Sequence, residues 1–331
     1  MSSQPDRATP GGEASLSDQR YRSQRVSTGF SSNSTNILVS PPHSPTHLEA
    51  RQHIRRLRGG SQAHLMGCSD EHYYVVKFPG NPQGTRILVN ELLCAQLAQL
   101  LRLPVPIAAF LNVSEELISR SSEMYFECGR GCKPCQPGLC FGSRHPAPGA
   151  IFFDSWPRRR IEDLENISDF AGMLVFDLWT ANIDFRQVLF LLERPNSRFR
   201  VKMFDNGFAF GGKDWTFKDK PRLALNPLLY VYDGIDGMNT FDPWLYKVEY
   251  EISQSDLQNA AREIPAEWYE SDSESLHRLL TNLYERRTRV RELIWSLRTA
   301  SPRLFPNWRT ESRVPADRLP RLGNPGLVNL E

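Results

Sequence analysis

The 331-residue sequence lacks the features that mark several large classes of protein. It has no run of eighteen apolar residues, so we expect no membrane-spanning helix. The N-terminus has no apolar core of the kind found in secretion signals, and we therefore expect a cytoplasmic protein. The net charge is only +2, too small to give a reason for nucleic-acid binding.

Cysteine is also scarce, with six residues, four of which lie close together as Cys128, Cys132, Cys135 and Cys140. Without a secretion signal, a disulfide framework is not the role that this cluster favours. Two interpretations remain open. The thiols, with His145 nearby, have the ligand chemistry of a Zn²⁺ site, although the spacing differs from the usual two pairs of ligands. Alternatively, they are reduced cysteines in an inserted loop.

Composition divides the chain into four parts. Residues 1–48 are dominated by small polar residues and proline, which predicts a disordered tail. Residues 49–150 combine β-prone runs with one helix and carry the Cys-rich insertion near 121–145. Residues 151–300 are mostly helical, and residues 301–331 form a tail rich in proline and arginine.

Within these parts, hydrophobic periodicity predicts a mixed α+β fold. Short β-prone runs bounded by turn residues predict strands, and apolar residues at helical spacing predict helices. The predicted elements are a strand over Tyr73–Phe78, a helix over Ile87–Leu101, a helix capped by Ser168, a hairpin of Val188–Leu192 with Phe199–Phe204, and an amphipathic segment over Ser273–Leu297.

Several residues have the chemistry that phosphoryl transfer from ATP requires: a backbone cradle and a cation for the phosphates, and carboxylates for Mg²⁺ and for the attacking hydroxyl. Gly59, Gly60, Ser61 and Gln62 are the candidate cradle, because two glycines let backbone N–H groups face an anion. Taken alone, this run is more typical of a plain turn.

Lys77 and Glu91 are the candidate phosphate-binding pair. Lys77 lies in a β-prone run, and Glu91 lies early in the helix that follows. Kinases use a strand lysine and a helix glutamate in this order to hold the lysine on the phosphates. The alternative is that both side chains lie on solvated faces.

Asp184 and Asp205 flank the predicted hairpin, one before it and one directly after it. This order places two carboxylates at the same end of the hairpin, where one can orient a nucleophile while the other binds Mg²⁺. Each aspartate alone is also typical of a turn or a helix cap. Together, downstream of Lys77 and Glu91, they form the strongest functional signal in the sequence.

These motifs together resemble the HipA-like kinases, a family related in fold to the phosphatidylinositol kinases. The resemblance covers about residues 52–300 and implies a two-lobed kinase-like fold, with a small β-rich N-lobe containing one main helix and a larger, mostly helical C-lobe. The motifs that carry it are Arg58–Gln62, Tyr74–Phe78, Asn90-Glu91, Phe176–Trp179, Asn182–Asp184 and Phe204–Gly207.

The resemblance also implies roles for the candidate residues. Lys77 contacts the ATP phosphates with support from Glu91, Asp184 is the catalytic aspartate, and Asp205 is the principal Mg²⁺ ligand. Residues Ile151–Trp156 form the hinge against which adenine packs.

One position departs from the family pattern. Five residues beyond Asp184, where the family usually has an asparagine that binds a second metal ion, stands Leu189, which cannot bind a hard cation. Gln187 is the candidate substitute. From the motifs together we expect an ATP- and Mg²⁺-dependent kinase that acts on a hydroxyl, with a protein serine or threonine as the favoured acceptor. The alternatives are a nucleotide-binding pseudokinase without turnover and, with less support, a lipid kinase.

Overall fold

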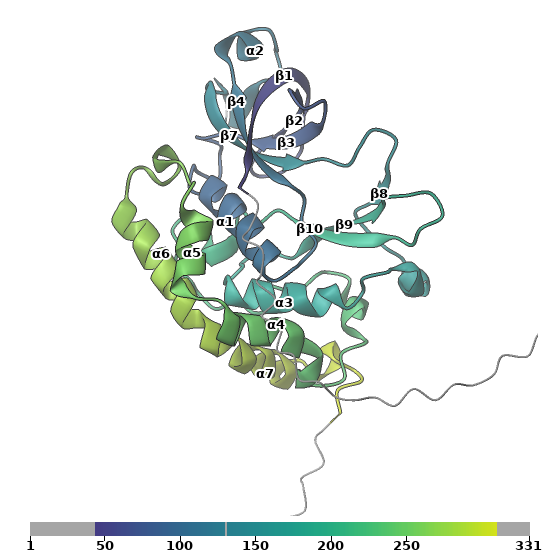
Figure 1. The fold of residues 1–331 in the computed structure, drawn as a ribbon. Helices are drawn as coiled ribbons and strands as arrows, with labels where there is room; N and C mark the ends of the chain where they lie inside the picture. Colours follow the sequence, from purple (N-terminus) through teal and green to yellow (C-terminus); the bar gives the residue numbers. More distant parts are fainter. Residues whose placement is uncertain (1–43, 130, 310–331) are drawn as a thin grey trace, which may run out of the picture. The chain divides into compact units, whose positions relative to one another are not determined.

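The structure, a computed structural model, describes residues 44–129 and 131–309 (Figure 1). These residues belong to one compact unit of the chain. The predicted N-terminal tail falls outside the described residues except for residues 44–48, as do positions 310–331 of the predicted C-terminal tail.

Five strands form a closed barrel in the order β1-β2-β3-β7-β4. All neighbours are antiparallel except β1 and β4, which run parallel. Apolar side chains such as Met66, Val76 and Leu111 fill the interior and account for the closure. The strands are β1 (Thr46–Arg56), β2 (His64–Cys68), β3 (Tyr73–Lys77), β4 (Ala108–Val113) and β7 (Gly138–Arg144).

The predicted Cys-rich insertion contributes more than a loop. A separate hairpin pairs β5 (Tyr125–Cys128) with β6 (Gly131–Pro134), and β7, which follows it, is part of the barrel. Phe126 is buried in the same apolar cluster as the barrel interior, so the hairpin packs against the barrel. The short helix α2 (Glu115–Ser119) precedes the hairpin.

Helix α1 (Ile87–Leu100) confirms the predicted helix and is buried from Ile87 to Ala98. It contacts β7 on one side and α5 on another. Because Asn90 and Glu91 lie within this buried stretch, their polar side chains must find partners inside the protein.

The predicted hairpin is also present, as β9 (Gln187–Leu192) and β10 (Arg200–Phe204). Their register sets Gln187 opposite Phe204, so the start of one strand meets the end of the other. Strand β8 (Ile151–Phe153) pairs with β9 and completes a three-stranded sheet.

The remaining chain is mostly helical (Figure 1). Ser168 precedes α3 as predicted, but its side chain makes no capping hydrogen bond. The amphipathic segment is two helices, α6 and α7, separated by a short 3₁₀ turn, Arg287–Arg289. The helices are α3 (Asp169–Trp179), α4 (Asp242–Tyr246), α5 (Gln254–Ala261), α6 (Ser273–Arg286) and α7 (Val290–Ala300), with a π turn at Lys247–Glu251 and further 3₁₀ turns at Arg158–Asp163, Ala209–Gly211, Leu229–Tyr232, Met238–Phe241, Ala266–Tyr269 and Pro302–Leu304.

One large apolar core joins α1, the β9–β10 hairpin and the helices from α3 to α7. Within it, α3 and α4 pack closely at Gly172, where any β-carbon would overlap the ring of Trp244. Across residues 44–129 and 131–309, none of the helices is both long and apolar enough to span a membrane.

Candidate active site

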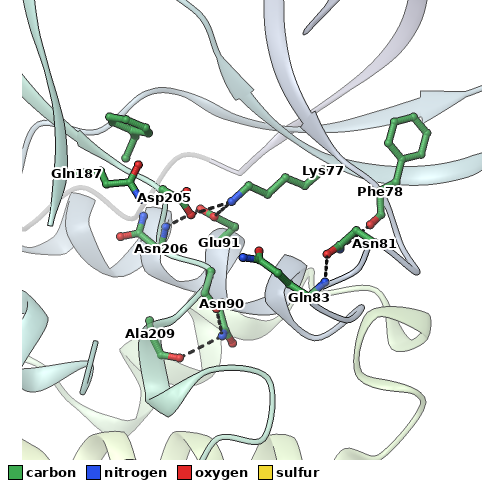
Figure 2. Close-up of polar contacts among 12 residues, drawn as sticks. Lys77, Phe78, Asn81, Gln83, Asn90, Glu91, Gln187, Asp205, Asn206 and Ala209 are labelled. Atoms are coloured by element: carbon green, nitrogen blue, oxygen red, sulfur yellow. Dashed lines mark hydrogen bonds and ion pairs between the residues drawn. The ribbon is translucent and has the colours of Figure 1, made fainter. Parts of the chain in front are cut away.

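Lys77 is the last residue of β3, and its side chain is buried. Its Nζ donates hydrogen bonds to the Glu91 carboxylate and, at 2.9 Å, to Asp205 Oδ1 (Figure 2). The structure therefore brings together three of the predicted site residues, one from β3, one from α1 and one from the segment after β10.

Lys77 and Asp205 stabilise each other's charges, whereas burial raises the pKa of Glu91. Burial disfavours the charged form of Lys77, but the adjacent carboxylates of Glu91 and Asp205 outweigh burial and raise its pKa. Burial likewise opposes ionisation of Asp205, yet the charge of Lys77 keeps the pKa of Asp205 below its ordinary value. Lys77 is therefore a cation and Asp205 an anion at neutral pH.

Asn90, the neighbour of Glu91 in α1, anchors the segment that follows Asp205. Its Nδ2 donates to the backbone carbonyls of Gly207 at 2.7 Å and Ala209 at 3.1 Å (Figure 2). Its Oδ1 accepts a 2.8 Å hydrogen bond from the Trp215 indole. The sequence indicated no separate role for Asn90. A polar residue among the buried apolar residues of the helix was the available signal.

The anchored segment has an unusual backbone. Asp205, Phe210, Trp215 and Phe217 all have φ between 49° and 60°. Such conformations cost on the order of 1 kcal/mol or more each in a residue other than glycine. They persist because Asn90 and Glu91 hold the segment, the latter by accepting the Asn206 N–H at 3.0 Å.

Asp184 lies in the loop between α3 and β9 and is partly buried. Its backbone N–H donates to Asn182 Oδ1 at 3.1 Å, and the next backbone N–H, from Phe185, donates to Asp184 Oδ1 at 2.8 Å. The Ile183 N–H donates to the Phe208 carbonyl at 3.2 Å, so this loop is bonded directly to the segment after Asp205.

Arg186 holds the Asp184 loop close to the residues on either side of Asp205. Its side chain is fully buried and pairs with Asp177 of α3 through two hydrogen bonds. It also donates to the Phe204 carbonyl at 2.9 Å and to Asn206 Oδ1 at 3.1 Å. Arg186 thereby connects the Asp184 loop with both neighbours of Asp205, a positioning role that the sequence did not reveal.

Gln187 and Leu189 occupy different environments on β9. Gln187 Nε2 lies 3.4 Å from Asp205 Oδ2 (Figure 2). If the amide is rotated by half a turn, its oxygen faces the same place and can join Asp205 in holding a cation. Leu189 instead lines a cavity and has no oxygen to offer.

That cavity has a volume of about 590 Å³ and is lined mostly by apolar side chains. Its floor is formed by β9 and β10, including Leu189 and Phe204, the residue directly before Asp205. Residues 144–151 also line the cavity, so of the expected hinge at Ile151–Trp156 only Ile151 contributes to the lining. Its size is typical of small-molecule sites.

The predicted cradle is the turn between β1 and β2. Gly59 has φ of +129°, which favours glycine, and the Gln62 N–H donates to its carbonyl at 3.1 Å. The Gln62 side chain is bound to the backbone of Glu127 on β5, at 2.7 and 3.0 Å, and Ser61 is buried. The backbone of Gly59 and Gly60 is thus the part of the turn left for a ligand.

The zinc interpretation of the four cysteines, one of the two left open by the sequence, is not supported by their positions. Cys128 and Cys132 are exposed, whereas Cys135 and Cys140 are buried. Burial raises the pKa of Cys135 to about 12, so this thiol is protonated at neutral pH. In the part of the chain that the structure describes, no group of three or more His, Cys, Asp or Glu residues can hold a metal ion.

A buried lysine held by a helix glutamate, next to an aspartate that follows a hairpin, is the arrangement on which kinase-like phosphotransferases depend. The fold and the site assign the chain to that class. More narrowly, the chain belongs to the HipA-like kinase family, whose sequence profile matches residues 52–294. The resemblance found in the sequence is confirmed.

Several solved structures are similar to this chain at low sequence identity. The Golgi casein kinase with Mn and ADP bound is 15% identical, with a TM-score of 0.43, over 78% of this chain and 74% of that one. Fam20 of hydra, with sugar, is 13% identical, with a TM-score of 0.48, over 82% and 92%. The Helicobacter pylori proinflammatory kinase CtkA is 13% identical, with a TM-score of 0.46, over 76% and 96%. No curated protein matches the chain.

Proposed function

We propose that this chain is an ATP- and Mg²⁺-dependent kinase that phosphorylates a hydroxyl group. The favoured acceptor is the hydroxyl of a protein serine or threonine. The observation that carries the proposal is the contact of the Lys77 ammonium with both Glu91 and Asp205. We take the barrel with α1 as the small lobe and the helices from α3 to α7 as the large lobe.

The residues present fit both cofactors. The Asp205 carboxylate, with the Gln187 amide beside it, offers the hard oxygen ligands that Mg²⁺ prefers. The cavity above Leu189 and Phe204 is large and apolar enough for a purine base. When bound, ATP supplies the phosphoryl group and Mg²⁺ offsets its negative charge.

Each residue then has one task. Lys77 binds phosphate oxygens and is oriented by Glu91, while the backbone of Gly59 and Gly60 faces the phosphates from the β1–β2 turn. Asp205 holds the metal. Asp184 orients the acceptor hydroxyl and accepts its proton.

One observation favours a second candidate function. Leu189 stands where the family usually has a metal-binding asparagine, and it lines the cavity instead. A pseudokinase that binds nucleotide without turnover follows if Gln187 does not replace the missing ligand.

Incubation of the purified chain with Mg²⁺ and γ-labelled ATP, alone and with a cell lysate, tests the proposal. Label on serine or threonine, absent when EDTA is added, is the expected result. Nucleotide binding without any label identifies the pseudokinase. Label that appears only in lipid extracts assigns the activity to a lipid hydroxyl.

A further inference from the structure

The turn Pro79–Thr85, between β3 and α1, has an internal framework that neither the sequence nor the proposed function explains. Asn81 is buried, and its Nδ2 donates to the carbonyls of Phe78 at 2.9 Å and Gly84 at 3.2 Å. Its Oδ1 accepts the Gln83 N–H at 2.9 Å. These bonds hold the backbone of the turn, including that of Gln83, and so set the direction in which the Gln83 side chain leaves it.

Gln83 extends from this turn toward Lys77 and Glu91 (Figure 2). Its side chain is half-buried, and the described part of the chain offers it no hydrogen-bond partner, although its backbone N–H is bonded. It also lies against the predicted cradle, because a β-carbon on Gly60 would overlap the Gln83 amide nitrogen. The Gln83 amide thus stands between the β1–β2 turn and the Lys77 cluster.

Two lysines flank the same turn. A β-carbon on Gly84 would lie 3.1 Å from Lys213 Cδ, and one on Gly80 would lie 3.8 Å from Lys133 Nζ. Both lysines are exposed. Their positive charges favour an anion at this end of the site.

We infer that Gln83 is a phosphate-binding residue, whose amide N–H groups donate to the phosphate chain of the nucleotide opposite Lys77. The inference rests on the proposed function and adds the Pro79–Thr85 turn as a second wall of the phosphate site. An amide suits this place because it donates to phosphate without adding a charge to the Lys77, Glu91 and Asp205 cluster.

Calorimetric titration with ATP, ADP and adenosine, each with Mg²⁺, tests the inference. Gln83→Ala should weaken ATP binding about tenfold and leave adenosine binding unchanged, since adenosine has no phosphate. Gln83→Glu, which keeps the shape and adds a negative charge, should weaken ATP binding further. Gln136→Ala, which removes an exposed amide after β6, is the matched control and should bind like wild type.

A double-mutant cycle with Gly60 makes the test specific. Gly60→Ala displaces the Gln83 amide and should weaken ATP binding as much as Gln83→Ala does, while the double variant should be no weaker than either. Additive losses, or equal loss of ATP and adenosine binding in Gln83→Ala, overturn the inference. Wild-type protein that binds none of the three ligands contradicts the proposed function itself.

Discussion

Lys77 and Asp205 are 128 positions apart in the sequence, and the Lys77 Nζ donates a 2.9 Å hydrogen bond to Asp205 Oδ1. The same ammonium group also binds Glu91 of α1. One buried cation therefore joins the barrel, the helix and the segment after β10. The proposed phosphate-binding and metal-binding positions are therefore linked through one ammonium group.

Replacement of Lys77 by alanine should abolish Mg-ATP binding and also destabilise the protein. The variant leaves Glu91 and Asp205 without their cation, and removal of one partner of a buried ion pair costs about 3–5 kcal/mol. Thermal unfolding with and without Mg-ATP measures both effects. Lys220→Ala, at an exposed position beside α7, should keep the ligand-induced shift of wild type. An equal shift in Lys77→Ala would contradict the assignment.

The two proposed metal ligands should differ in importance. Asp205→Asn should make nucleotide affinity independent of Mg²⁺, because it removes the anionic ligand. Gln187→Ala should only raise the Mg²⁺ concentration needed for half-maximal binding, since a neutral amide contributes less. Nucleotide titrations across a range of Mg²⁺ concentrations separate the two. A Gln187→Ala curve that overlays wild type excludes Gln187 as a ligand.

Asn90→Asp should destabilise the fold by about 3 kcal/mol, although the two side chains have the same shape. A carboxylate oxygen would face the carbonyls of Gly207 and Ala209, which lose a buried donor. Urea unfolding measures the change. In the control Asn259→Asp, the exposed oxygen that accepts from Arg262 is retained, so its stability should match wild type. Equal stability of the two variants would remove Asn90 as the anchor.

Acid should destabilise the barrel through His64. This side chain is fully buried beside His53, and burial lowers its pKa from 6.5 to about 4. Between these two pH values the unfolded chain binds a proton that the folded chain does not, so stability is complete above pH 6.5 and falls by about 3 kcal/mol as the pH drops to 4.

His64→Phe tests this pH dependence, because the side chain already contacts the rings of Phe78 and Phe126. The variant should lose less stability than wild type between pH 6.5 and 4, in urea unfolding at several pH values. His277→Gln, at an exposed position on α6, should keep the wild-type slope. Parallel slopes in wild type and His64→Phe rule out His64 as the source.

Local patterns in the sequence were enough to predict β3 and α1, which carry Lys77 and Glu91, and the β9–β10 hairpin, which Asp205 directly follows. Each has its own apolar spacing and its own turn residues. Strand β1 escaped prediction because most of its side chains are exposed, so it has no apolar alternation. Strand β7 was hidden by the glycine and cysteine content of its surroundings, and its pairing with β3 and β4 is non-local.

The site was predictable only where one residue type implies one chemistry. A lysine and carboxylates suggested phosphate and metal binding. The contacts of Asn90 and Arg186, and the role inferred for Gln83, depend on the directions of their side chains, which the order of residues does not reveal. For the cysteines, closeness in the sequence suggested a shared site that the structure does not form. Cys132 and Cys140 are near in sequence, yet one lies on the exposed β6 and the other inside the barrel.

The central claim, that this site transfers phosphate with Asp184 as the catalytic aspartate, is tested most directly by one paired measurement on Asp184→Asn. Phosphate transfer and Mg-ATP affinity are determined on the same preparations of wild type and variant. The predicted result is an affinity within about twofold of wild type and a transfer rate lower by about 10² to 10⁴, the usual contribution of a general base. A variant that transfers phosphate at the wild-type rate would contradict the account and place the catalytic group elsewhere.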